Sequence, residues 1–440
     1  YRKLGWRFLE LLNGMFTLVL IDERHQSVHL VTDRLGKKPI YLKRTSEGLF
    51  FASELKSFLL NFDCTIDRKH LNDGFFLGFQ PYPLTNVEGI EKLAPGMRIE
   101  ISPTGVSRHS WYVLRPQTVE DAPDAVKFRY NEILDDAVKI RMEADVDVGF
   151  CLSGGLDSTS IAASAARQNF KGLHAFCAVI EGKEHTTDNQ NGLRFAKEVG
   201  LQLHSVPVNA KTYDDSLIRS CFIFDDGNYE SCGMNFFHIA NEAKKFVRVL
   251  LDGTGGEELF FGYPHHYLYH RIPDLVLNKL PYNGELLRFA QDHSTRGGIL
   301  LRAMMDTSTW FPFERSYIPV TLMRKSTHFD VDALFLQMKA VAEPYTKNFA
   351  NPTDLNCLSY LDILGFCMAN FQRVDRGAMA CSIEPRSPLS DYRLWEYLFG
   401  IPEKTKFGKE VKSYMREIST GLPDYILNAK KEGFSNPLHR

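Results

Sequence analysis

The stretch whose residue types and spacing most clearly suggest chemistry is VGFCLSGGLDSTSIAAS, residues 148–164. An apolar run ends at Ser153-Gly154-Gly155, and a helical pattern begins immediately afterwards. The two glycines permit backbone shapes that other residues resist, and they let a ligand approach the main chain closely. The free N–H groups and the dipole of the following helix suit a phosphate. This order of residues therefore predicts a phosphate-binding loop between a strand and a helix.

Side chains of the same stretch refine that prediction. Ser153, Ser158 and Thr159 add hydroxyl donors, and Asp157 fits an anion site when a divalent cation lies between its carboxylate and the phosphates. The Walker loop is excluded, because it needs the spacing G-x-x-x-x-G-K-[ST]. The simpler alternative is a glycine turn followed by a helix that Asp and Ser cap. The full run S-G-G-L-D-S favours a loop for a metal-bound polyphosphate.

The loop needs a sheet to hold it, and the sequence predicts one. Residues 126–142 have helical spacing, and apolar strands are expected at 146–152, 172–180, 201–208 and 247–253, with helices at 192–200 and 237–246 between them. Alternating strands and helices indicate a mostly parallel sheet with helices on both faces. Ligands of such sheets bind at the carboxyl ends of the strands, and the predicted loop directly follows the carboxyl end of the strand that contains 148–151. From about residue 280 the chain is expected to be mainly helical.

The first hundred residues have a different pattern. Two strands around a polar turn are expected within 15–31, a strand leading into a short helix within 47–59, and a hairpin within 93–114. The polar, acidic stretch RPQTVEDAPDA, residues 115–125, reads as a linker. We therefore expect one domain over 1–114, a linker over 115–125 and a second domain over 126–440.

Composition limits the classes of partner. The chain has 440 residues with a formal net charge of -2, which gives no support to a nucleic-acid or polybasic membrane partner. No run of about twenty apolar residues is present, so no membrane span is expected. The 8 cysteines are scattered without a C-x-x-C pair, which indicates free thiols in a reducing compartment and hence the cytoplasm.

The loop S-G-G-x-D-S resembles the pyrophosphate loop of the N-type ATP pyrophosphatases, and further segments resemble the asparagine synthetase family. These segments are LLDGTGGEELFFGYPHHY (250–267), VDRGAMACSIEPRSPLSDYRL (374–394) and KEVKSYMRE…LPDYILNAKKEGFSNPL (409–438). In the first half, LNGMFTLVLID, TDRLGKKPIYL and FASELKSFL resemble the later part of a class II glutamine amidotransferase domain. The resemblance implies a partial α-β-β-α amidotransferase sandwich, then a doubly wound parallel-sheet ATP pyrophosphatase domain with a helical C-terminal part.

The resemblance also implies site residues, carried over position by position. The positions that match the family's nucleotide-binding loop, adenine pocket and sugar contact are Leu152, Ser153, Gly154, Gly155, Asp157, Ser158, Ala178 and Gly253. Lys412, Glu257, Glu258 and Arg386 match catalytic positions, Arg386 as part of a pair with Glu384 near the acceptor. Asp157 and Glu257 match the magnesium ligands. Taken alone, Lys412 would be a solvated lysine, Arg386 a structural ion pair and Glu257-Glu258 helix-start acids.

Two departures from the family pattern follow. The N-terminal cysteine nucleophile of the glutaminase, its glutamine-binding Arg and its Asn-Gly element would all precede Tyr1, so the sequence is expected to be either a fragment truncated at its N-terminus or a chain without glutaminase. Thr254 stands where asparagine formers usually carry a carboxylate and β-lactam synthetases a tyrosine, and a threonine cannot act as a comparable base near neutral pH. Asp252 is one residue that could compensate.

The resemblance therefore implies an ATP-dependent amide ligase that uses ATP and Mg²⁺. In the parent case it adenylates aspartate and transfers ammonia, drawn from glutamine, to give asparagine, AMP and pyrophosphate. The alternative is a tailoring enzyme of the β-lactam synthetase or lasso-peptide cyclase type, with another carboxylate. A nucleotide-binding relative without chemistry is disfavoured by the intact loop, and a tRNA-modifying pyrophosphatase by the charge. The expected partners are small molecules, with neither nucleic acid nor membrane, and a homodimer is compatible with the family.

Overall fold

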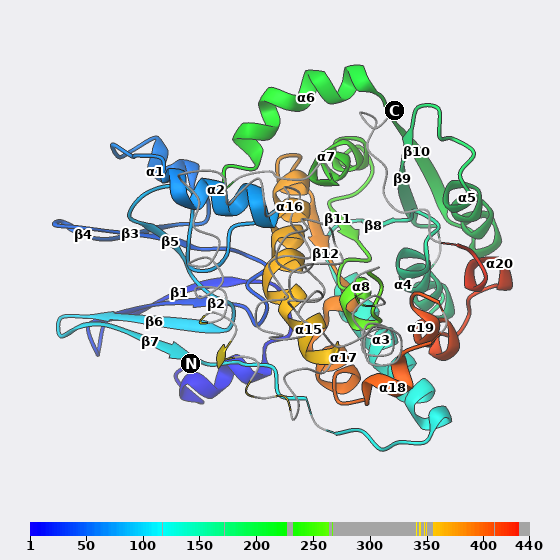
Figure 1. Ribbon diagram of the computed structural model, residues 1–440, viewed down its shortest axis with the longest axis horizontal. Helices are drawn as coiled ribbons and strands as arrows, with labels where there is room; N and C mark the ends of the chain where they lie inside the picture. Colours follow the sequence, from blue (N-terminus) through cyan, green and yellow to red (C-terminus); the bar gives the residue numbers. More distant parts are fainter. Residues whose placement is uncertain are drawn as a thin grey trace, which may run out of the picture. The chain divides into compact units, whose positions relative to one another are not determined.

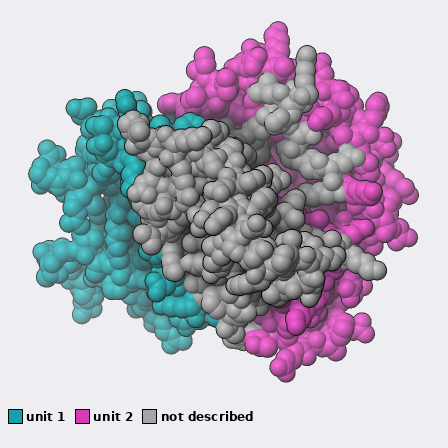
Figure 2. Space-filling model, in the orientation of Figure 1, with its two compact units in different colours: residues 1–115, 225–229, 265–372 teal, residues 116–224, 230–264, 373–440 magenta. Residues whose placement is uncertain are grey.

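The structure is a computed structural model that describes residues 1–116, 118–170, 172–226, 232–263, 266, 340, 343–344, 347, 349, 355–408 and 410–430. The chain divides into two compact units, which Figure 2 colours separately. Unit 1 comprises residues 1–115, 225–229 and 265–372, and unit 2 comprises 116–224, 230–264 and 373–440. The domain boundaries expected from the sequence, at 114 and 126, remain predictions.

Unit 1 contains two antiparallel sheets (Figure 1). The four-stranded sheet has the order β1-β2-β6-β7, with β1 at Thr17–Asp22, β2 at Ser27–Thr32, β6 at Met97–Ser102 and β7 at Gly105–Ser110. The three-stranded sheet has the order β4-β3-β5, with β3 at Tyr41–Thr45, β4 at Gly48–Ala52 and β5 at Ile90–Lys92. The helical elements described in this unit are η1 (Gly5–Leu11), α1 (Lys56–Leu59), α2 (Arg68–Leu77), α15 (Leu355–Asp362) and the π-helix η2 (Ile363–Cys367).

Alternation along β3 shows how the two sheets form a sandwich. Leu42 packs in one buried cluster with Leu30 of β2 and Ile99 of β6, so this face of β3 meets the four-stranded sheet. Its neighbour Tyr41 lies in a second cluster with Phe58 of α1, on the opposite face. Successive residues of a strand point to opposite faces. The arrangement is therefore helix on sheet on sheet, in agreement with the predicted amidotransferase sandwich.

Unit 2 is built on a five-stranded parallel sheet of order β10-β9-β8-β11-β12. Its strands are β8 (Val148–Cys151), β9 (His174–Ile180), β10 (Gln202–Val208), β11 (Val249–Leu251) and β12 (Glu384–Arg386). The larger helices described are α3 (Pro123–Met142), α4 (Leu156–Arg167), α5 (Thr187–Val199), α6 (Ala210–Ile223), α7 (Cys232–Ala243) and α16 (Met368–Met379), whose first residues belong to unit 1. Shorter elements follow: α8 (Gly256–Leu259), η3 (Pro388–Ser390), α17 (Tyr392–Leu398), α18 (Glu403–Lys406), α19 (Ser413–Ile418) and α20 (Asp424–Leu427).

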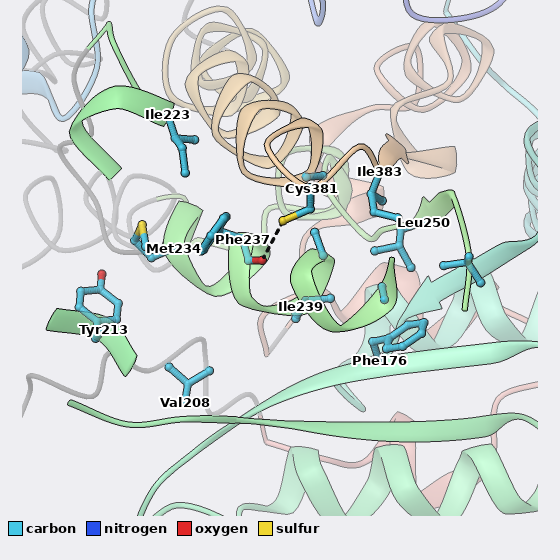
Figure 3. Close-up of a cluster of buried hydrophobic side chains, with 14 of the residues drawn as sticks. Phe176, Val208, Tyr213, Ile223, Met234, Phe237, Ile239, Leu250, Cys381 and Ile383 are labelled. Atoms are coloured by element: carbon cyan, nitrogen blue, oxygen red, sulfur yellow. Dashed lines mark hydrogen bonds between the residues drawn. The ribbon is translucent and has the colours of Figure 1, made fainter. Parts of the chain in front are cut away.

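Helices cover both faces of this sheet. Phe176 of β9 lies in a buried cluster with Phe237 of α7 and Ile383, which Figure 3 shows. The next residue, Cys177, points the other way, and its Sγ lies 3.6 Å from Oδ1 of Asn189 in α5. Because neighbouring residues of one strand meet helices on opposite sides, the sheet is doubly wound, as the sequence predicted.

Most expected elements of the second half are present, with shifted ends. The helix expected at 192–200 begins at Thr187, because the Thr186 side chain accepts a hydrogen bond from Asn189 N at 3.3 Å and caps the helix. Helix α6 was not expected at all. The helical pattern expected from residue 280 lies outside the described residues up to 339, and helices occupy much of the chain from Leu355 onward.

Seven cysteines within the described part of the chain carry free thiols. Burial raises the pKa of Cys177 to about 12, so this thiol stays protonated at neutral pH. Among the residues described, no helix has the length and apolar character needed to cross a membrane.

Candidate active site

The predicted loop lies where parallel sheets bind ligands, at the carboxyl end of β8 and before α4. Leu152 N donates to Phe176 O at 2.9 Å and so extends the ladder between β8 and β9 by one residue. Gly154 then adopts a left-handed backbone with φ of +84°. A Cβ there would overlap the Asp188 carbonyl oxygen and lie 2.5 Å from Gly192 N, both in α5. Only glycine lets the loop approach α5 so closely.

Hydroxyl groups of the loop hold its shape. Ser158 Oγ accepts from Ser153 N at 3.2 Å, and the two side-chain oxygens lie 3.0 Å apart. Ser153 Oγ also accepts from Gly155 N at 3.3 Å. The N-cap of α4 is Gly155, which offers no side chain to the N–H groups of the first turn. This is not the side-chain-capped helix of the simpler alternative, and it leaves a helix start of the kind that binds anions.

A buried lysine joins the loop to a distant segment. Lys412, with 5% of its side chain exposed, forms ion pairs with Asp157 Oδ2 and, at 2.9 Å, with Glu257 Oε1. Burial on its own would lower the pKa of the Lys412 ammonium, but the two carboxylates outweigh burial and raise that pKa above its ordinary value. The ammonium is therefore charged at neutral pH, and segments around residues 157, 257 and 412 meet at one point.

Three glycines pack around this cluster, and sequence reasoning singled out only one of them. A Cβ on Gly253 would lie 3.0 Å from Asp157 Cβ, which places this residue directly against the loop. A Cβ on Gly256 would lie 2.7 Å from Asp157 Cγ, and one on Gly262 would lie 2.5 Å from Lys412 Cε. The repeated glycines of 253–262 were visible in the sequence, but their partners were not. They allow the carboxylates and the ammonium to approach one another.

Two predicted catalytic residues make other contacts. The buried Glu258 accepts a hydrogen bond from the Tyr263 hydroxyl at 2.7 Å. Arg386 pairs with Glu384 at 2.8 Å and donates to the carbonyl oxygens of Arg141 and Glu143, at 2.8 and 2.9 Å. These carbonyls end helix α3, so the guanidinium acts as a C-terminal cap.

The segment that contains Thr254 is fixed by the buried residue Asp252. Asp252 Oδ1 accepts from Thr254 N at 2.8 Å, and Oδ2 accepts from Ser387 Oγ at 2.8 Å. Its own N–H donates to Arg386 O at 2.9 Å. These bonds hold the loop after β11 against the chain that follows β12, so the carboxylate has a structural task.

The two residues predicted to line an adenine pocket lie on neighbouring strands. Leu152, fully buried, directly follows β8, and the half-buried Ala178 lies in β9. Both are near the carboxyl ends of their strands, the edge at which the loop lies.

The donor set of the cluster fits magnesium. Two carboxylates, Asp157 and Glu257, converge on one cation, and Mg²⁺ is usually bound by one or two carboxylates together with substrate phosphates. Within the described ranges, no group of three or more His, Cys, Asp or Glu side chains could hold a metal ion on its own. A site completed by phosphate oxygens is the kind that these residues can form.

Comparison with known proteins agrees with this geometry. The sequence profile of the asparagine synthase family matches residues 129–440, and that of a glutamine amidotransferase domain matches residues 1–112. Glutamine-hydrolysing asparagine synthetase 1 of Bacillus subtilis is 27% identical over 97% of this chain and 68% of its own length. Asparagine synthetase 3 of the same organism is 26% identical over the same shares. The chain therefore belongs to the asparagine synthase family, the glutamine-hydrolysing carbon–nitrogen ligases that form an amide with ATP.

Proposed function

We propose that the chain binds ATP at the 152–158 loop, adenylates a carboxylate and transfers ammonia to it. The observation that carries the proposal is the meeting of Lys412, Asp157 and Glu257 beside the glycine loop. A buried ammonium, two carboxylates and a helix start without a side-chain cap are the groups that a metal-bound triphosphate needs.

The proposed residue roles are those that the sequence suggested. The nucleotide is assigned to Leu152, Ser153, Gly154, Gly155, Asp157, Ser158, Ala178 and Gly253. Lys412, Glu257, Glu258 and Arg386 are assigned to catalysis. For Lys412 and Glu257 the ion pairs support the assignment. Glu258 and Arg386, whose described contacts are to Tyr263 and to helix α3, are assigned by resemblance alone.

The proposed reaction has two steps. A carboxylate oxygen attacks the α-phosphorus of ATP, the bond to the β-phosphate oxygen breaks, and pyrophosphate leaves. Ammonia then attacks the acyl carbon, AMP leaves, and the nitrogen loses a proton to give the amide. Negative charge grows on the phosphate oxygens in the first step, where Lys412 and the N-terminus of α4 stabilise it.

Magnesium is proposed as the metal, held by Asp157 and Glu257. When bound, it would supply positive charge to the phosphate oxygens. The Lys412 ammonium contacts both of these carboxylates, so it lies beside the residues that would hold the ion and is placed to contact the phosphates.

Aspartate is the acceptor that the proposal takes first, with asparagine as the product. Thr254 favours a second candidate, an amide-forming tailoring enzyme with a different carboxylate. The nearest carboxylate in sequence, Asp252, is buried and hydrogen-bonded to Thr254 N and Ser387 Oγ. Because its oxygens have these structural partners, Asp252 is a poor substitute for the missing base.

The remaining assignments concern the whole protein. We propose a class II glutamine amidotransferase domain over 1–114, a linker over 115–125 and a ligase domain over 126–440. Glutamine is the proposed source of ammonia in the native protein, and the cytoplasm is the proposed compartment, which the free thiols support. A homodimer that acts only on small molecules completes the proposal.

The test supplies ammonium directly, so that no glutaminase is needed. The chain is incubated with ATP, Mg²⁺ and ammonium, with and without aspartate, and asparagine and pyrophosphate are measured. Aspartate-dependent formation of both supports asparagine synthesis. ATP binding without aspartate-dependent release of pyrophosphate supports the tailoring enzyme, whose carboxylate is absent from this mixture, and a folded chain that does not bind ATP refutes both candidates.

A further inference from the structure

The backbone of Lys412 is held in an unfavourable conformation. Its φ of 59° and ψ of 27° lie in the left-handed region, which residues with a Cβ seldom adopt. Such a residue persists only where its surroundings fix it. The contacts of the chain on either side of Lys412 therefore decide whether its ammonium reaches Asp157 and Glu257.

One residue, Arg416, contacts both peptides that flank Lys412: its side chain holds the preceding peptide and its backbone N–H the following one. The guanidinium of Arg416 donates from Nη1 to Val411 O, the carbonyl directly before Lys412. The backbone N–H of Arg416 donates to Lys412 O at 3.2 Å. A hydrogen bond from a charged donor is about twice as strong as a neutral one, so this contact fixes the preceding peptide well.

The same guanidinium is anchored to the end of α20. Its Nε donates to Leu427 O at 2.7 Å, and Nη2 donates to Ala429 O at 3.1 Å. A planar guanidinium can hold three carbonyls in a fixed arrangement, which a lysine ammonium on its flexible stem cannot. Arg416 therefore links the turn that contains Lys412 to a second segment of chain.

That second segment is attached to the helix that supports the phosphate loop. Asn191 of α5 donates to Tyr425 O at 3.3 Å, and the Tyr425 hydroxyl donates to Glu198 of the same helix at 2.6 Å. The next residue of α5, Gly192, packs against Gly154. The contacts thus run from the loop through α5, α20 and Arg416 to Lys412.

We propose that Arg416 is a positioning residue for Lys412, which it holds in the left-handed conformation that the ion pairs require. The inference rests on the proposed function, because it assigns Lys412 to the phosphates of ATP. Loss of the guanidinium lets the turn relax to ordinary backbone shapes, and Lys412 then spends only a minor fraction of its time between the carboxylates.

The first experiment measures how well Lys412 is protected, without any nucleotide. The wild type, Arg416→Met and Arg416→Lys are treated briefly with acetic anhydride, and labelled lysines are quantified by mass spectrometry. We expect Lys412 to be labelled about tenfold faster in Arg416→Met, and at an intermediate rate in Arg416→Lys. Lys406, with 2% exposure and its Nζ 4.5 Å from the Phe261 ring centre, is the internal control and should stay protected.

Two results would overturn the inference. Equal protection of Lys412 in all three proteins would mean that Arg416 does not hold it. Faster labelling of Lys406 together with Lys412 would mean that the arginine only stabilises the unit as a whole. If Arg416→Met does not fold, the comparison of Arg416→Lys with the wild type decides by the same criteria.

The second experiment measures Mg²⁺–ATP binding by calorimetry. Arg416→Met should weaken binding about tenfold, and the double variant with Lys412→Met should bind no more weakly than Lys412→Met alone. Arg248→Met is the matched control, because Arg248 also donates to backbone carbonyls, Lys244 O and Val247 O, but lies at the amino end of β11. Additive losses in the double variant would overturn the inference.

A wild type that does not bind Mg²⁺–ATP would instead refute the proposed function, while the labelling would still decide whether Arg416 holds Lys412.

Discussion

The sharpest structural prediction concerns two adjacent glycines of the loop. Gly154 has a left-handed backbone, and a Cβ would overlap Asp188 O and lie 2.5 Å from Gly192 N. Gly155 has φ of -73°, and its Cβ would meet only Ser153 Oγ at 3.4 Å, an ordinary contact. Replacing each by alanine therefore adds the same methyl group to two very different environments.

The expected magnitudes follow from these contacts. For Gly154→Ala, the left-handed backbone costs about 1–2 kcal/mol and the overlap with backbone atoms about 1–3 kcal/mol more. We therefore expect a loss of about 2–5 kcal/mol in the free energy of unfolding. For Gly155→Ala, alanine is a poorer N-cap than glycine, and the loss should be about 1 kcal/mol.

The assay is urea unfolding of both variants and the wild type, with amide hydrogen exchange as a second measurement. In Gly154→Ala, exchange should be faster in the first turns of α5, where the overlapping atoms of Asp188 and Gly192 lie. In Gly155→Ala, that helix should exchange as in the wild type. Equal unfolding free energies for the two variants, or unchanged exchange in α5 in Gly154→Ala, would refute the reasoning.

Two further predictions concern residues outside the loop. Arg386→Met removes the cap of helix α3 and should lower the free energy of unfolding by about 1–3 kcal/mol. Mg²⁺–ATP binding should change less than about twofold. Loss of that binding by a folded variant would contradict the capping role. Burial raises the pKa of Asp73 in α2 from 3.8 to about 6, so its protonated form is favoured in the folded state. The free energy of unfolding of the wild type should therefore fall as pH rises from about 4 to 6. Asp73→Asn should be more stable than the wild type by up to about 3 kcal/mol at pH 7.5, but not at pH 4. Urea unfolding of both proteins at the two pH values is the measurement.

The sequence was sufficient for the loop because the loop is local. The order strand, Ser-Gly-Gly, helix places Ser153, Gly154 and Ser158 relative to one another with no long-range information. Apolar runs likewise predicted β8, β9, β10 and β11, of which β8, β9 and β11 are mostly buried, whereas the three-residue strand β12 was not predicted. The ends of helices depended on caps such as Thr186, which polar loops conceal.

The cluster around Lys412 could not be derived from local pattern. Its members come from three segments whose contacts depend on packing across the whole unit, and only the family resemblance brought Asp157, Glu257 and Lys412 together beforehand. Neighbours in sequence can also have different tasks. Glu257 pairs with the lysine, whereas Glu258, one residue on, turns toward Tyr263.

The importance of Gly262 was equally hidden. A Cβ at this position would overlap the side chain of Lys412, which lies 150 residues away in sequence. Arg386 illustrates the converse, since a position that resembles an acceptor-site residue has hydrogen bonds that cap a helix. Contacts of this kind follow from the three-dimensional structure and not from residue type or spacing.

The most direct test of the central claim is the identity of the nucleotide product. The chain is incubated with ATP labelled at the α-phosphate, Mg²⁺, ammonium and either aspartate or a panel of other carboxylates, and the products are separated. Cleavage between the α- and β-phosphates, with AMP and pyrophosphate formed by the wild type and lost in Lys412→Met, is the predicted result. Formation of ADP and phosphate, or equal AMP formation by Lys412→Met, would contradict the assignment of this site to adenylation.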